Sequence, residues 1–313
     1  MATLIAPCNH SPQEDAEVLQ KAFKGWGTDE NAVIVILGHR NVYQRQEIRT
    51  AYEEIFQEDL VKKLESELTG DFERAVYRWI LEPADRDAVL ANVALKSGKN
   101  YYVIVEISSV LSPEELLAVR RAYLDRYKRS LEEDIASHTS GHLRQLLVGL
   151  VTSYKYTGDE INAKLAESEA EILHEAIKEK KGSQEEAVRI LSTRSKTQLI
   201  ATFNYYREIH GTSITKKLLD EASDDFQKAL YTAIRCTTNH TKYYEKVLRD
   251  AIKRVGTDED ALTRVIVSRA EIDLRVISEV YYKRNSVLLE HALAKETSGD
   301  YKNFLLTLLG KDD

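Results

Sequence analysis

The sequence predicts an all-α protein built from repeated helical units, and three observations predict it. Apolar residues recur at three- and four-residue spacing from Glu14 onward, as in Val18, Leu19, Ala22 and Phe23. That spacing is typical of helices that bury one face. The 313 residues contain four prolines, 43% hydrophobic and 30% charged residues, a composition typical of a soluble, helix-rich chain. The same features also return at fixed intervals along the sequence.

The first unit, residues 14–82, is expected to hold five short helices. The stretch Phe23–Glu30 contains two glycines and separates the first two of them. Thr28 is a suitable N-cap for the second helix, and the acidic residues after it lie where the helix dipole favours anions. Gly70 suits the left-handed conformation found just past a helix end.

This unit recurs after 71, 154 and 229 residues. Tyr52, for example, returns as Tyr123 and Tyr281, and Arg40 returns as Arg194 and Arg269, arginines that we expect to hold helix C-terminal carbonyls. The longest step lies between the second and third copies, so we expect that segment to divide the protein into halves. The predicted parts are a tail (1–13), four repeats (14–82, 83–154, 169–238 and 243–312) and a linker (155–168).

Charge and composition exclude several classes of protein. A net charge of −7 argues against a nucleic-acid-binding surface and against unaided binding to an anionic membrane. The longest apolar runs, such as 32–37 and 146–151, fall short of the ~20 residues that a membrane span needs. No signal-peptide pattern opens the chain. Cys8 and Cys236 form no disulfide framework and fit a reducing compartment, so we expect a cytoplasmic protein.

Two stretches, Phe23–Glu30 and Ile252–Glu259, have the pattern of a metal-binding loop. Each joins two helices through a glycine turn, and a glutamate follows at the same distance: Glu67 lies 42 residues after Gly25, and Glu296 lies 42 after Arg254. Backbone carbonyls with one carboxylate form a hard oxygen donor set, which favours calcium. A plain helix–helix turn is the alternative reading.

The other two copies depart from this pattern. The second copy keeps Gly98 but has His138 in place of the glutamate, and imidazole is a poor calcium ligand. The third copy keeps Glu221, but its loop is Glu179-Lys180-Lys181-Gly182-Ser183, in which a lysine replaces the second glycine. We therefore expect functional loops in the first and fourth copies.

The repeat, the Gly25-Trp26-Gly27-Thr28 loop, the spacing to the acidic residue and the closing Ser298–Tyr301 stretch together resemble the annexin family, most of all plant annexins. The resemblance covers residues 14–312. It implies an all-α fold of four homologous five-helix repeats in a slightly curved disc. Calcium loops on the convex face of that disc would dock to acidic phospholipid membranes.

The resemblance also implies the calcium ligands. They are the carbonyls of Phe23, Gly25 and Gly27 with the Glu67 carboxylate, the carbonyls of Ile252, Arg254 and Gly256 with Glu296, and an accessory site on Thr28 and Glu30. Separately, residues at the loop tips are placed to contact a membrane, since tryptophan favours the interface and lysine can pair with phosphate. These residues are Lys24, Trp26, Lys253 and Val255.

The leading interpretation is therefore a calcium-regulated membrane-binding protein rather than an enzyme. A calcium-regulated cation-conducting protein is one alternative, with Asp87 and Arg264 as residues for a polar axis. A peroxidase-like or nucleotide-hydrolysing side activity is another, but His39 follows a helix-ending glycine, as a capping residue does, and no Walker A loop is present. Self-association on membranes stays open, and no nucleic-acid partner is expected.

Overall fold

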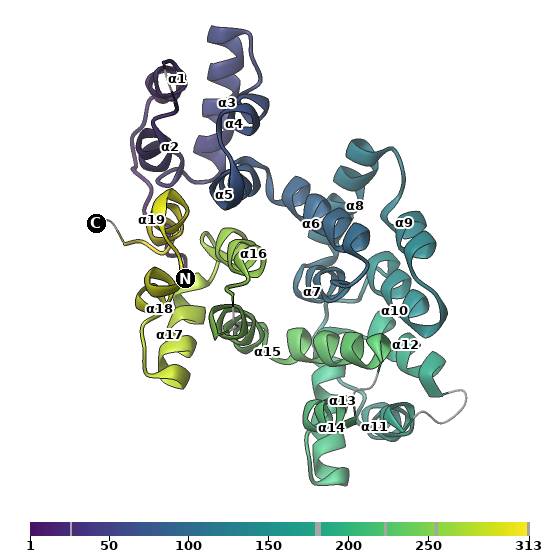
Figure 1. Cartoon of the computed structure of the whole chain (residues 1–313). Helices are drawn as coiled ribbons and strands as arrows, with labels where there is room; N and C mark the ends of the chain where they lie inside the picture. The colour runs from purple at the N-terminus through teal and green to yellow at the C-terminus, as the bar shows by residue number, and fades with distance from the viewer. Residues whose placement is uncertain (26, 179–182, 222–223, 254–255, 312–313) are drawn as a thin grey trace. The chain divides into compact units, whose positions relative to one another are not determined.

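The computed structural model describes residues 1–25, 27–178, 183–221, 224–253 and 256–311. Every regular element in these ranges is a helix, as predicted (Figure 1). The chain forms two compact units: Met1–Arg86 with Tyr244–Asp313, and Asp87–Tyr243. The first and fourth repeats therefore share one unit, and the second and third share the other. The expectation that the segment after residue 154 divides the chain into halves is wrong, because that segment lies inside the second unit.

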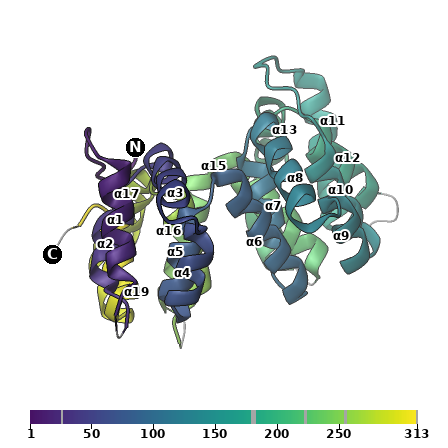
Figure 2. The ribbon, with the colours of Figure 1, turned by 90° about the horizontal axis from the view of Figure 1, so that it is seen from above.

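The first repeat supplies five helices to the first unit. They are α1 (Pro12–Ala22), α2 (Glu30–Leu37), α3 (Val42–Phe56), α4 (Leu60–Glu67) and α5 (Gly70–Ile80); α1, α2, α4 and α5 run alongside one another in Figure 2. Asp29, not Thr28, caps α2, since its side chain accepts a hydrogen bond from Ala32 N at 3.0 Å. The prediction for Thr28 is wrong because that hydroxyl is engaged elsewhere. Gly70 has φ +68°, the left-handed conformation expected for it.

The fourth repeat completes the first unit. It begins in α15 (Asp225–Lys253), which is kinked at Asn239, and continues through α16 (Glu259–Arg269), α17 (Leu274–Asn285), α18 (Leu289–Glu296) and α19 (Gly299–Leu308). Helix α19 packs against α2, α5 and α16. Trp79 is fully buried here: its indole donates to Leu37 O at 2.7 Å, and the Arg45 guanidinium lies 3.7 Å from the ring centre. The two repeats thus share one core.

The second unit holds the second and third repeats. Its helices are α6 (Pro83–Ser97), α7 (Tyr102–Val110), α8 (Pro113–Tyr127), α9 (Leu131–His138), α10 (Gly141–Thr152), α11 (Ala163–Ile177), α12 (Ser183–Thr193), α13 (Lys196–His210), α14 (Ile214–Glu221) and the first part of α15. Residues 153–162 are not helical. Helix α11 begins at Ala163, so the last residues of the predicted 155–168 linker are helical.

The repeated arginines bind carboxylates rather than helix-end carbonyls alone. Arg40 pairs with Asp15 through two hydrogen bonds of 2.7 Å and also donates to His39 O. Arg194 pairs with Glu169, which stands in the third repeat where Asp15 stands in the first, and donates two hydrogen bonds, of 2.9 and 2.7 Å, to its Oε1. Each pair links the first helix of a repeat to the end of the second helix of the same repeat. The expectation of carbonyl capping alone was incomplete, because the acidic partner lies 25 residues earlier in the sequence.

Candidate calcium-binding loops

The first loop has a backbone that only glycine adopts readily. Gly25 has φ +128° and Gly27 has φ +97°, and a Cβ added at either would meet no atom within 4 Å. Torsion, not crowding, therefore favours glycine at both positions. Asp29 N donates to Ala22 O at 3.0 Å and closes the turn between α1 and α2. Phe23, at the end of α1, is buried.

The end of α4 lies against this loop. Thr28 Oγ1 donates to the backbone oxygen of Glu67 and to its carboxylate Oε2, both at 3.3 Å. The structure therefore brings together a glycine loop and a carboxylate that is 39 residues away from Thr28 in the sequence. Glu67 remains partly exposed. Carbonyl and carboxylate oxygens at one place suit a hard cation such as calcium.

The fourth repeat reproduces this arrangement. Asp258 N donates to Ala251 O at 3.1 Å, Gly256 has φ +76°, and Thr257 Oγ1 donates to Glu296 O at 3.3 Å. Ile252 is buried at the end of α15, as Phe23 is at the end of α1. The predicted ligand Arg254 lies outside the described residues.

The two loops differ in the charge beside the carboxylate. Lys63, one turn before Glu67 on α4, has its Nζ 2.7 Å from Glu67 Oε1. The equivalent position before Glu296 is Ala292, which carries no charge. A cation entering the first loop must therefore compete with an ammonium group that the fourth loop lacks.

The second repeat holds no comparable donor set. Gly98 has φ +63°, but His138 occupies the glutamate position, and its Nδ1 lies 2.7 Å from Asp134 O on its own helix. In the third repeat, residues 179–182 of the loop lie outside the described part of the chain.

Of the four residues predicted to contact a membrane, two are described. Lys24 is exposed, and so is Lys253, whose Nζ donates to Asn285 Oδ1 at 3.1 Å. Trp26 and Val255 lie outside the described residues. His39 has its Nδ1 3.0 Å from Val35 O, the position of a side chain that holds a carbonyl at the end of α2.

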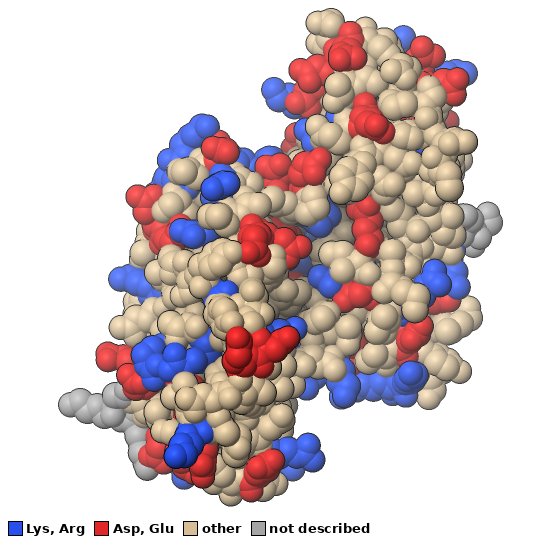
Figure 3. Space-filling view, turned by 180° about the vertical axis from the view of Figure 1, so that it is seen from behind, with Lys and Arg blue, Asp and Glu red and all other residues tan. Residues whose placement is uncertain are grey.

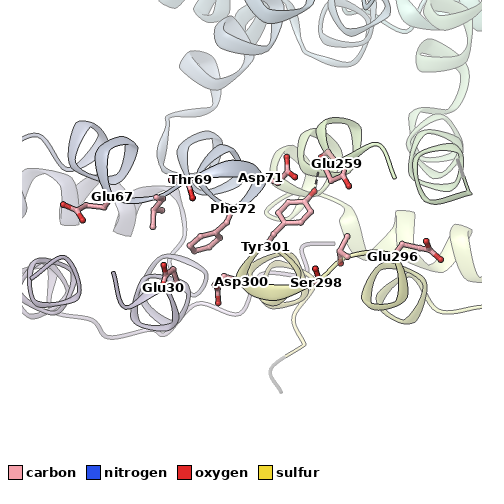
Figure 4. Close-up of a pocket in the computed structure, with 12 residues that line it drawn as sticks. Glu30, Glu67, Thr69, Asp71, Phe72, Glu259, Glu296, Ser298, Asp300 and Tyr301 are labelled. Atoms are coloured by element: carbon pink, nitrogen blue, oxygen red, sulfur yellow. Dashed lines mark hydrogen bonds between the residues drawn. The ribbon is translucent and has the colours of Figure 1, made fainter. Parts of the chain in front are cut away.

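A pocket of about 360 Å³ lies between the first and fourth repeats (Figure 4). Its twelve lining residues form six pairs, each related by the 229-residue shift, and half of them are acidic. The carboxylates are Glu30, Glu67, Asp71, Glu259, Glu296 and Asp300. The sequence prediction included Glu259 at the end of the fourth loop, but it did not place Asp71 and Asp300 beside the loops, although the 229-residue shift pairs them. Their shared negative charge favours cations near both loops.

Two features of the described residues limit the chemistry. No three or more histidine, cysteine, aspartate or glutamate side chains gather there to hold a metal ion. A metal at either loop would therefore depend on backbone oxygens. Within the same residues, no helix combines the length and apolar character that crossing a bilayer requires.

Four five-helix repeats, with glycine loops set against a carboxylate in the first and fourth, define a helical-repeat protein with candidate calcium sites. The family model described as Annexin matches residues 14–79, 86–150, 168–233 and 243–308, and the chain belongs to the annexin family. That family is known for calcium-dependent phospholipid binding, and its members are mainly peripheral membrane-binding proteins.

Individual relatives and solved structures agree with this assignment. The chain is 70% identical over 314 residues to annexin-like protein RJ4 of Fragaria ananassa, with all of both chains covered, and 53% identical to annexin D6 of Arabidopsis thaliana, with 100% and 99% covered. The predicted resemblance to plant annexins is thus confirmed. Annexin III superimposes with a TM-score of 0.92 at 34% identity, covering 100% of this chain and 98% of that one. A calcium-bound annexin (Sm)1 superimposes with a TM-score of 0.83 at 30% identity, covering 99% and 93%.

Proposed function

We propose that this protein binds acidic phospholipid membranes in response to calcium, through the loops of the first and fourth repeats. The contact between Thr28 and Glu67 is the observation that carries the proposal, because it holds a carboxylate against a loop whose glycines have positive φ. We also propose that the protein is cytoplasmic and is recruited to the membrane when calcium rises. The proposal retains the repeat boundaries predicted from the sequence, 14–82, 83–154, 169–238 and 243–312.

In the first loop, the ligands are the carbonyls of Phe23, Gly25 and Gly27 and the carboxylate of Glu67. In the fourth they are the carbonyls of Ile252, Arg254 and Gly256 and the carboxylate of Glu296. Three carbonyls and a carboxylate leave part of a 6–8-oxygen calcium shell open to a lipid phosphate. Thr28 and Glu30 are assigned to the accessory site, with Glu30 lining the acidic pocket beside Glu67.

The charge distribution explains why a bridging ion is needed. The protein carries a net charge of −7, and an anionic leaflet repels it. On the face shown in Figure 3, basic and acidic side chains are interspersed rather than gathered into one broad basic area. Binding should therefore rise with both calcium and anionic lipid, while Lys24, Trp26, Lys253 and Val255 add contacts at the loop tips.

Co-sedimentation with phosphatidylserine liposomes over a calcium titration, followed by chelator, tests the proposal. Pelleting should require calcium, reverse with chelator and disappear in the double variant Glu67→Gln, Glu296→Gln. The double variant Glu65→Gln, Glu279→Gln removes the same charge from exposed positions outside both loops and should pellet as the unchanged protein does. Full binding by the first double variant would refute the assignment of the sites. None of the described contacts favours the cation-conducting or enzymatic alternatives.

A further inference from the structure

A second pocket, of about 440 Å³, lies in the other unit, between the second and third repeats. We call it the 153–159 pocket after the segment that forms one wall. The turn between α7 and α8, the start of α13, and Thr237 of α15 complete it. None of its lining residues belongs to the glycine loop around Gly98. Its volume lies in the ~300–1,000 Å³ range of small-molecule sites.

One lining residue is a cation without a partner. Lys155 is partly buried and makes no hydrogen bond or ion pair with any described residue. Burial lowers the pKa of Lys155 to about 8, because no neighbouring charge offsets the loss of hydration. A poorly hydrated ammonium group without a counterion is unfavourable by itself, and an anion in the pocket would relieve that cost.

The acidic residues of the same pocket are engaged with other groups. Glu115 accepts a hydrogen bond from Ser112 N at 2.8 Å, in the capping box at the start of α8. Asp159 Oδ1 accepts from Thr197 Oγ1 at 3.4 Å. Both carboxylates therefore accept hydrogen bonds from other groups, and neither forms an ion pair with Lys155.

Donors for an anion remain available in the pocket. The Ser109 hydroxyl is buried without a hydrogen-bond partner among the described residues. Lys196 adds a second cation as the first residue of α13. The N-terminus of α13, a 15-residue helix, lines the pocket and also favours negative charge.

Part of the remaining lining is apolar, beside the hydroxyl groups of several serine and threonine residues. Val110, Leu111 and Pro113 contribute apolar side chains that are only half-buried, so they still present surface to a ligand. A hydrocarbon or aromatic body would remove this surface from water, which is favourable. We propose that the 153–159 pocket binds a small organic anion, in which a phosphate or carboxylate is attached to an apolar or aromatic body.

Pyridoxal 5′-phosphate is a suitable probe, because it joins an aromatic ring, a phosphate and an aldehyde. The Lys155 amine would attack the aldehyde carbon with loss of water, and borohydride would reduce the resulting imine to a stable amine that mass spectrometry can map. At pH 7.5, an amine with a pKa near 8 is unprotonated roughly 200-fold more often than an ordinary lysine. The exposed Lys164 of α11 is the internal control.

We expect Lys155 to be labelled saturably and at least tenfold faster than Lys164. Pyridoxal, which lacks the phosphate, should label Lys155 at least tenfold more slowly than the phosphate ester does. Labelling of Lys155 no faster than of Lys164, or equal labelling by both aldehydes, would overturn the proposal. Inorganic phosphate should compete only at concentrations at least tenfold above those of phenyl phosphate; equal competition would overturn the apolar part of the proposal.

A non-covalent measurement separates recognition from reactivity. In calorimetric titration with phenyl phosphate, Lys155→Met should weaken binding at least tenfold, while Lys164→Met should leave it unchanged. Because Lys155 has no partner, Lys155→Met should also unfold at the same temperature as the unchanged protein, or higher. Unchanged affinity, or a lower unfolding temperature, would contradict the role assigned to Lys155.

Discussion

Replacement of Lys63 by alanine is expected to tighten calcium binding at the first loop. The Lys63 ammonium lies 2.7 Å from Glu67 Oε1, with the two side chains 28% and 24% exposed. An ion pair this accessible contributes about 0.5 kcal/mol or less, and a cation must displace it. The variant removes that competitor while leaving the carboxylate and the glycine turn in place.

The repulsion between lysine and calcium adds to this effect. A calcium ion about 2.4 Å from the carboxylate oxygen would lie within roughly 5 Å of the ammonium. In water that repulsion is about 1.7 kcal/mol, and salt at ~0.15 M reduces it by about half. Because the lysine side chain can also swing away, we expect a total near 1 kcal/mol, which corresponds to about fivefold tighter binding.

Calorimetric calcium titration in the Glu296→Gln background isolates the first loop for this measurement. Lys62→Ala removes the same charge from the adjacent exposed position and should change the affinity far less. Conversely, Ala292→Lys, measured in the Glu67→Gln background, should weaken the fourth loop by about fivefold. An equal change in the Lys63 and Lys62 variants would show that net charge, not the local ion pair, governs the first loop.

Three further predictions follow from the backbone and from the buried charges. Gly27→Ala places an L-residue at φ +97°, so differential scanning calorimetry should show a loss of about 1–2 kcal/mol of stability, and calcium titration should show weaker binding. Asp15→Asn leaves Arg40 without its counter-charge at a site where both side chains are at most 12% exposed, and should cost about 3 kcal/mol in urea unfolding. His174 stacks on His210 at 3.7 Å, and burial, together with the charge of His210, lowers the pKa of His174. The neutral imidazole is therefore the form that stabilises the fold, so stability should be complete above pH ~6.5 and fall as the pH drops below it. His210→Phe should flatten that pH dependence in thermal melts.

The repeat could be predicted from the sequence because each copy keeps the same chemistry at the same place. Tyr52, Tyr123 and Tyr281 are all buried where the 71- and 229-residue shifts place them. Which repeats share a core could not be predicted, since equal shifts describe similarity between copies and not contact between them. The family model and the helix count confirm the fold, whereas the assignment of the calcium ligands remains a proposal.

The prediction of a local detail was wrong where two residues could serve equally well. Thr28 and Asp29 are both good N-caps and are neighbours in the sequence. The choice depends on the tertiary contact of Thr28 with Glu67, which no local pattern contains. The Arg40–Asp15 pair, by contrast, could have been found, because the 154-residue shift also carries Asp15 to Glu169 and Arg40 to Arg194.

The first unit is assembled from the two ends of the chain, and this has a consequence for protein synthesis. Residues up to Arg86 leave the ribosome first, but the rest of their unit begins only at Tyr244. At ~5–20 residues per second, the first repeat must wait roughly 10–30 s for its partner. During that interval the face of α5 that later packs on α16 and α19 has no native cover. The second unit is continuous in sequence, so it can fold while the first is still incomplete. Chaperones should therefore bind most strongly to nascent chains that end before α16.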